Sequence, residues 1–139
     1  MLQIRPGPVA PQIKSHIYQW LRLIASGQWI DALAMLDEPN AYNTTWTEEF
    51  IRQLIERDTF GPGTIFRDAH PDGIVYSDPD GVSGEDHFDI GEFNNAHSEG
   101  FWADIDMPLN GEWSDLTAQF ILVRRPSGYA LVLEDLHVL

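Results

Sequence analysis

The chain has 139 residues, a formal net charge of -14 and no cysteine. The length predicts one domain with a single core, and the absence of cysteine excludes disulfides, thiolate metal sites and cysteine nucleophiles. No apolar run reaches the ~18 residues of a membrane span and the first residues lack the pattern of a secretion signal, so we expect a cytoplasmic protein without membrane contact.

The first part of the chain predicts helices over about residues 11–59. Residues 1–10 contain Pro6 and Pro8 and no periodicity, so we expect them to be extended or disordered unless they lie along an edge of the fold. Helical spacing of apolar residues predicts a first helix from Pro11 to Ser26-Gly27 and a second from Trp29 to Leu36. A third helix should begin after Thr45, which has capping-box spacing to Glu48, or after Thr47, and should end at Phe60-Gly61-Pro62-Gly63.

From about residue 64 to residue 139 the pattern predicts a sheet. Ile65–Arg67 and Ile74–Tyr76 are expected as short strands, which could pair through DAHPDG. Ser77–Asp86 is expected as an acidic loop, with a polar stretch following to Asn95. The segment from Gly100 to Leu139 predicts three antiparallel strands. Asn110-Gly111 is the signature of a type I′ hairpin turn, and residues 124–128 make a second reversal.

Helices followed by an antiparallel meander define an α+β domain over residues 11–139, with the helices on one face of the sheet. In the last strand, regular alternation puts Asp135 and His137 on the same face as Leu131 and Leu133. Both faces of this strand are largely apolar. We therefore expect the second face of the sheet to be covered by a second protomer, making a homodimer, or by the preceding loop segment.

The helix pair joined by SGQWIDALAMLDE, the third helix and the long terminal meander together resemble the NTF2-like (cystatin-like) superfamily of cone-shaped α+β domains. The segments DMPLNGEWSDLTAQF and LVLEDLHVL also resemble an uncharacterised family of small bacterial proteins. The resemblance implies a curved sheet that forms a cone with the helices. In enzymes of the superfamily, such as ketosteroid isomerases and polyketide cyclases, an Asp, sometimes with Tyr or His, lies inside the cone. No catalytic motif of theirs aligns with this chain residue by residue.

Two groups of residues are candidates for a site. Asp135 and His137 are candidate catalytic residues because a carboxylate beside a histidine supports proton transfer, although a strand-end pair bonded to the backbone is the simpler interpretation. Trp113, Asp115, Thr117 and Tyr129 are candidate ligand-binding residues, which could line a small pocket or could merely cap turns and pair across strands.

The acidic residues are unevenly placed: thirteen Asp or Glu and no Lys or Arg lie between Asp68 and Val123. Such a surface repels nucleic acid and attracts a basic protein, though solubility alone also accounts for it. Three histidines share this segment, but their spacing matches no metal motif. Asp68-x-His70-x-Asp72-Gly73 matches only the front of a calcium loop, which has Pro79 where its Glu should be. We therefore predict no metal and no cofactor.

The sequence favours a non-enzymatic acidic binding domain that recognises a basic protein partner or a small apolar molecule. An immunity-type protein that neutralises a basic toxin is one concrete form of this interpretation. The alternative is a small-molecule isomerase, dehydratase or cyclase with Asp135 and His137 in an apolar cavity, where burial raises the pKa of a carboxyl group. The alternative requires an open cavity between the helices and the sheet.

Overall fold

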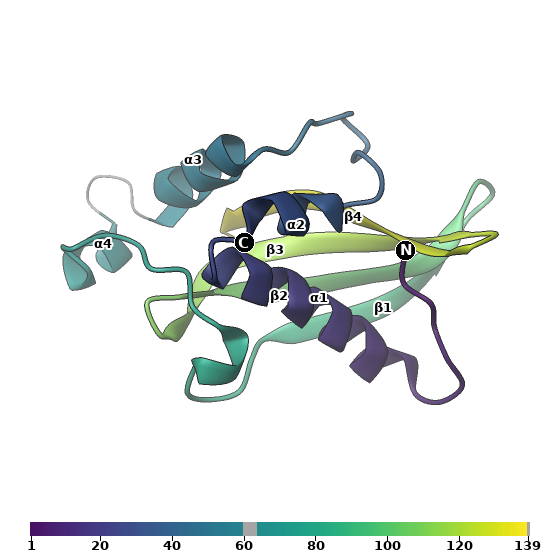
Figure 1. Cartoon of the computed structure of the whole chain (residues 1–139), viewed down its shortest axis with the longest axis horizontal. Coiled ribbons are helices and arrows are strands. Elements are labelled where there is room, and N and C mark those ends of the chain that lie inside the picture. Colours follow the sequence, from purple (N-terminus) through teal and green to yellow (C-terminus); the bar gives the residue numbers. More distant parts are fainter. Residues whose placement is uncertain (60–63, 139) are drawn as a thin grey trace.

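The computed structural model describes residues 1–59 and 64–138 and has the predicted α+β class, with helices packed on a four-stranded antiparallel sheet in the order β1-β2-β3-β4 (Figure 1). The helical elements are α1 (Val9–Ala25), α2 (Trp29–Ala34), α3 (Glu48–Thr59), α4 (Ile65–Ala69) and the single 3-10 turn η1 (Pro79–Gly81). The strands are β1 (Phe88–Asn94), β2 (Glu99–Leu109), β3 (Glu112–Arg125) and β4 (Gly128–Val138). Within the described residues, none of the helices has both the length and the apolar character needed to cross a bilayer.

The first helix has the predicted apolar stripe and the predicted end. Its buried residues recur at helical spacing and pack on the sheet; they are Ile13, Ile17, Trp20, Leu21 and Ile24. The helix ends at Ala25, with Ser26 as its C-cap, because Gly27 takes a φ of +75°, which a glycine adopts without strain. It begins at Val9, two residues before the predicted start.

The second and third helices refine the predicted boundaries. The second helix stops at Ala34 instead of Leu36. The Oγ1 of Thr47 accepts a hydrogen bond of 3.1 Å from the backbone N–H of Phe50, so Thr47, and not Thr45, caps the third helix. Ile51 and Ile55 of this helix are fully buried. The predicted end at Phe60-Gly61-Pro62-Gly63 lies outside the described residues.

The region between the helices and the meander differs from the prediction in three ways. Ile65–Arg67 is helical, as part of α4, because the Oγ1 of Thr64 caps its first turn by accepting from the N–H of Arg67. Ile74–Tyr76 contributes only an isolated bridge from Tyr76 to Leu109 and pairs with the end of β2. The strand β1 lies within the polar stretch that follows the expected acidic loop, where we predicted no strand.

The hairpin between β2 and β3 is confirmed. Asn110 and Gly111 have φ angles of 52° and 78°, as a type I′ turn requires. The side chain of Asn110 also binds the preceding loop, since its Nδ2 donates to the carbonyl of Gly73 and its Oδ1 accepts from the N–H of Val75. This turn therefore holds residues 73–77 against the sheet as well as reversing the chain.

Replacing Gly111 by Val should lower the free energy of unfolding by about 1–3 kcal/mol, since a β-branched residue at positive φ is strained. No atom lies within 4 Å of the position that its Cβ would take, so the cost is one of backbone conformation alone. Thermal unfolding measures it. Gly111→Asn is the matched control, because Asn tolerates this φ, and equal melting temperatures for the two variants would contradict the turn assignment.

A β-bulge in the last strand corrects the predicted division of its two faces. Gln119 pairs with Asp135, but the next residue, Phe120, pairs with Leu133, so Glu134 is an extra residue in β4. Leu131, Leu133 and, beyond the bulge, Leu136 are fully buried in the core. Asp135 therefore does not share a face with Leu131 and Leu133, as regular alternation had suggested, and neither does His137.

Candidate functional site

We call the face of the sheet opposite to α1, α2 and α3 the open face, and it carries a band of carboxyl groups. Asp89 of β1 lies directly opposite Asp104 of β2, which lies opposite Gln119 of β3, and Gln119 lies opposite Asp135 of β4. Like charges that lie directly opposite each other destabilise an antiparallel sheet. The pairing of Asp89 with Asp104 is therefore unfavourable for the fold.

A pocket of about 330 Å³ adjoins this band on the open face. It is lined by Trp102, Asp104, Gln119, Phe120, Ile121 and Glu134. The indole of Trp102 is 39% exposed and lies over Gly91, where an added Cβ would come within 2.4 Å of the indole nitrogen. The glycine thus leaves the space that the ring occupies. The pocket combines an accessible aromatic ring with two carboxyl groups, and we call it the Trp102 pocket.

Both carboxyl groups of the Trp102 pocket are shifted toward their neutral forms. Burial raises the pKa of Asp104 and nearby Asp89 raises it further, while a hydrogen bond from Gln119 and the charge of His137 oppose the shift. Burial also raises the pKa of Glu134. The charge of Asp135 raises this pKa further, and a backbone hydrogen bond from Ala41 lowers it. Each carboxylate is therefore partly deprived of water and would gain from a cation placed beside it.

A second row of polar groups crosses the open face, two residues away along each strand; it consists of Asp106, Thr117 and His137. Asp106 accepts a hydrogen bond of 3.1 Å from the Oγ1 of Thr117, and its other oxygen lies 2.6 Å from the Nδ1 of His87. Thr117 pairs with His137, whose Nδ1 lies 3.0 Å from an Oδ of Asp135. The distance is that of an ion pair. The contact is not a hydrogen bond, since this Nδ1 has no hydrogen-bond partner among the described residues.

The structure separates the residues that the sequence had grouped as a site. Asp135 and His137 contact each other, but on the open face and not between the helices and the sheet. Thr117 shares that face with them. Asp115 is exposed. The indole of Trp113 lies against Tyr18 of α1, with ring centroids 6.3 Å apart, while Tyr129 packs on Phe101 near the opposite end of β3. The four predicted ligand-binding residues therefore do not line one pocket.

Large side chains occupy the space between α1 and the sheet. Trp20 and Phe120 meet edge to face with ring centroids 5.2 Å apart, and both are at most 1% exposed. The residues packed around them are aliphatic and fully buried; they include Ile13, Ile17, Ile51, Leu116 and Leu122. The interior position that the catalytic hypothesis requires for Asp135 and His137 is thus taken by apolar core residues.

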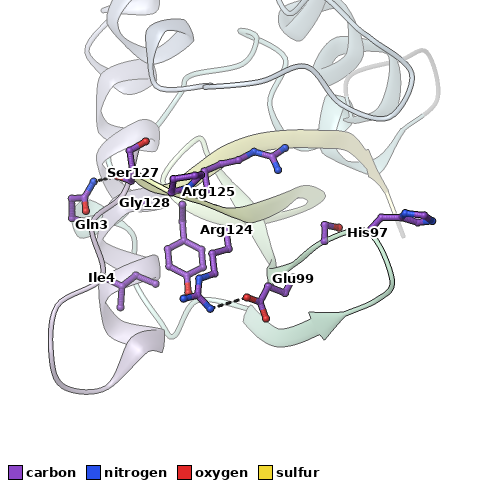
Figure 2. A pocket seen from close by; sticks show the side chains of 11 residues that line it. Gln3, Ile4, His97, Glu99, Arg124, Arg125, Ser127 and Gly128 are labelled. Carbon is purple, nitrogen blue, oxygen red and sulfur yellow. Dashed lines mark hydrogen bonds and ion pairs between the residues drawn. The ribbon is translucent and has the colours of Figure 1, made fainter.

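A larger pocket, of about 650 Å³, lies where the N-terminal segment meets the tips of the two outer hairpins (Figure 2). Its two arginines are already paired. Arg124 donates to Glu99 at 2.7 Å, and Arg125 makes two hydrogen bonds to Glu38, of 2.8 and 2.7 Å. Since these charges are neutralised within the chain, we consider the smaller Trp102 pocket to be the better candidate site despite its size.

The sequence prediction missed Trp102, Asp104 and Glu134. The first two follow the strand alternation of FWADID, in which Trp102, Asp104 and Asp106 point to one face and Ala103 and Ile105 to the other, so this signal was present. Within residues 1–59 and 64–138, no group of three or more metal-binding side chains is placed to hold an ion. No family model, curated protein or solved structure matches the chain.

Proposed function

We propose that this protein is a binding domain that recognises a basic protein partner through its open face, with a lysine or arginine side chain of the partner in the Trp102 pocket. The scaffold of the proposal is NTF2-like, with helices on one face of an antiparallel meander. An immunity-type protein that neutralises a basic toxin is its most specific form. A gene for such a toxin beside this one would support that form.

The observation that carries the proposal is the unfavourable state of the carboxyl groups on the open face. Asp89 and Asp104 oppose each other, burial raises the pKa of Asp104 and Glu134, and no lysine or arginine of the described residues pairs with any of the three. Carboxylates held in this way, with His137 as the only positive neighbour of Asp104 among the described residues, cost stability. A cation from a partner would relieve that cost, which favours a basic ligand over an acidic one.

The shape of the Trp102 pocket suits a long cationic side chain. The methylene stem of a lysine or arginine would pack on Trp102 and Ile121, while its charged end would lie between Asp104 and Glu134. A cation over the face of a tryptophan contributes about 0.5–2 kcal/mol. An apolar ligand would instead remove water from two carboxylates without replacing it, so the pocket supports a small apolar molecule less well.

The alternative of an isomerase, dehydratase or cyclase has no comparable support. It requires Asp135 or His137 on the wall of a cavity between helices and sheet, and the two residues lie on the open face while Trp20 and Phe120 fill the interior. A histidine next to a carboxylate is also ordinary at the solvated end of a strand, so the pair needs no catalytic explanation. The binding interpretation uses the same carboxylates without requiring a cavity.

Pull-down from native lysate tests the proposal, with the full chain as bait at about 0.1 M and about 1 M salt, where the screening length falls from about 10 to about 3 Å. We expect a basic protein that is retained at low salt, lost at high salt and not captured by Trp102→Ala. Ile30→Ala is the control, because Ile30 is 85% exposed and belongs to α2, which lies on the opposite face of the sheet. Capture that is the same with both variants, or no partner at either salt, would contradict the proposal.

A further inference from the structure

The two outer edges of the sheet are treated differently by the rest of the chain. Three segments of the chain bond to backbone groups on the outer edge of β4. Leu2 exchanges two 2.9 Å backbone hydrogen bonds with Tyr129, and Asp37 binds both the N–H and the carbonyl of Leu131. Further along the same edge, two side chains donate to carbonyls, Trp46 to Leu133 and Asn40 to Glu134. The β4 edge is therefore closed to another strand.

The outer edge of β1 has no such cover. The carbonyl of His87 accepts from Asp106, and the N–H of Asn95 donates to Ser98, so the odd-numbered residues of β1 direct their backbone groups toward β2. By alternation, the N–H and C=O groups of the even-numbered residues point outward; they are Phe88, Ile90, Glu92 and Asn94. Among the described residues, none donates to or accepts from these outward groups.

The open edge lies beside the first turn of α1, which crosses β1 in Figure 1. Between them is a hollow of about 190 Å³ lined by Val9, Ala10, Ile90, Gly91, Glu92 and Phe101. Its lining is apolar except for Glu92. The edge and the helix turn together form a groove, which we call the β1 groove. A strand laid along β1 would find backbone partners on one side and a side-chain pocket beneath the helix.

We infer that the β1 groove binds an extended basic segment of a partner protein, which adds to the sheet as a fifth strand. Outward backbone groups would give the affinity and alternate side chains the specificity. One side chain of the added strand would enter the hollow beside Glu92, and its neighbour, on the open face, would lie beside Asp89. Both positions favour lysine or arginine with an apolar stem.

Charge selects this occupant over a second copy of the chain. A copy would bring its own net charge of -14 to an edge that carries Asp89 and Glu92. Lys14 of α1, the single lysine of the chain, is already paired with Asp86 at 2.6 Å. The inference rests on the proposed function in that the partner is basic, but it concerns an edge and not the Trp102 pocket, so the two are tested by different variants.

The probe is a blocked seven-residue peptide of lysine and valine with two adjacent lysines at its centre, titrated into the full chain and followed by calorimetry and by NMR of backbone amides. We expect binding that perturbs the amides of Ile90 and Glu92. The same peptide with its alternate backbone nitrogens methylated keeps its charge but cannot pair with a strand edge. The loss of two or more hydrogen bonds should weaken it by about tenfold or more.

Two protein variants separate strand pairing from charge. Glu92→Pro removes an outward N–H that the monomer does not use, and an edge strand tolerates proline at such a position. Glu92→Gln removes the charge and keeps the N–H. Glu92→Pro should weaken the peptide by about tenfold relative to Glu92→Gln, with little change in melting temperature. If Glu92→Pro does not fold, the comparison of the plain and methylated peptides still tests strand pairing.

Several results would overturn the inference. Equal binding of the plain and methylated peptides would mean charge attraction without strand addition, and no binding at millimolar peptide would mean that the edge is not a site. A concentration-dependent dimer that Glu92→Pro dissociates would assign the edge to a second copy. None of these results bears on capture of a partner by the Trp102 pocket, whose failure would show instead in Trp102→Ala.

Discussion

Replacing Trp20 by Ala should lower the free energy of unfolding by about 3–5 kcal/mol, because a fully buried aromatic ring leaves a cavity that the core closes only in part. The melting temperature should fall by about 10–20 °C. The variant also loses the edge-to-face contact of Trp20 with Phe120, which joins α1 to the middle of β3. Calorimetry or circular dichroism measures the loss.

Trp20→Phe is the matched control for this prediction. The indole nitrogen of Trp20 has no hydrogen-bond partner among the described residues, so phenylalanine gives up volume but no hydrogen bond, and should cost only about 1–2 kcal/mol. If Trp20→Ala unfolded within about 2 °C of the wild type, the space between helices and sheet would be loosely packed.

The double variant Asp104→Asn, Glu134→Gln should weaken the basic partner by about 100-fold, equivalent to about 2.7 kcal/mol, while making the free protein more stable. Both effects have the same cause. The carboxylates are unfavourable in the free protein because burial raises the pKa of each, and one of them faces Asp89 across the strand pair. Removing the charges should raise the melting temperature by about 1–4 °C.

The stability gain of this double variant should depend on pH in a defined direction. A carboxyl group whose pKa is higher in the folded protein favours folding when it is protonated, and this contribution is lost as the pH rises through the folded pKa. The variant should therefore match the wild type below the ordinary values of 3.8 and 4.5 and gain on it at higher pH. A variant that is less stable than the wild type at pH 7 would show that these groups serve the fold and not a partner.

Those parts of the fold that depend on short-range chemistry were predictable from the sequence. Asn110-Gly111 strongly favours one turn conformation, type I′. The apolar stripe of α1 defines the buried face of the helix, whichever element packs against it. The predicted helices and the three long strands follow from signals of this kind. The strand β1 also alternates, with Phe88 and Ile90 on one side, but Gly91 and three polar residues weaken its apparent strand propensity. Its formation depends on pairing with β2.

The site was harder to predict because its residues meet only through tertiary pairing. The bulge at Glu134 shifts the alternation of β4 by one residue, which moves Asp135 and His137 to the open face. Nothing local in LVLEDLHVL indicates that extra residue. Asp104 and Glu134 come from β2 and β4, with β3 between them, so their common pocket could not be read from spacing.

The closure of the β4 edge has a consequence for how the chain folds during synthesis. Leu2, Asp37 and Trp46 leave the ribosome long before Tyr129, Leu131 and Leu133, the groups with which they pair. Until β4 emerges, the N-terminal segment and the loop after α2 have no counterpart, and β3 is the exposed edge of an incomplete sheet. Contacts of such long sequence separation form slowly. The nascent chain therefore completes its sheet in one late step, and the need for chaperone protection is greatest just before that step.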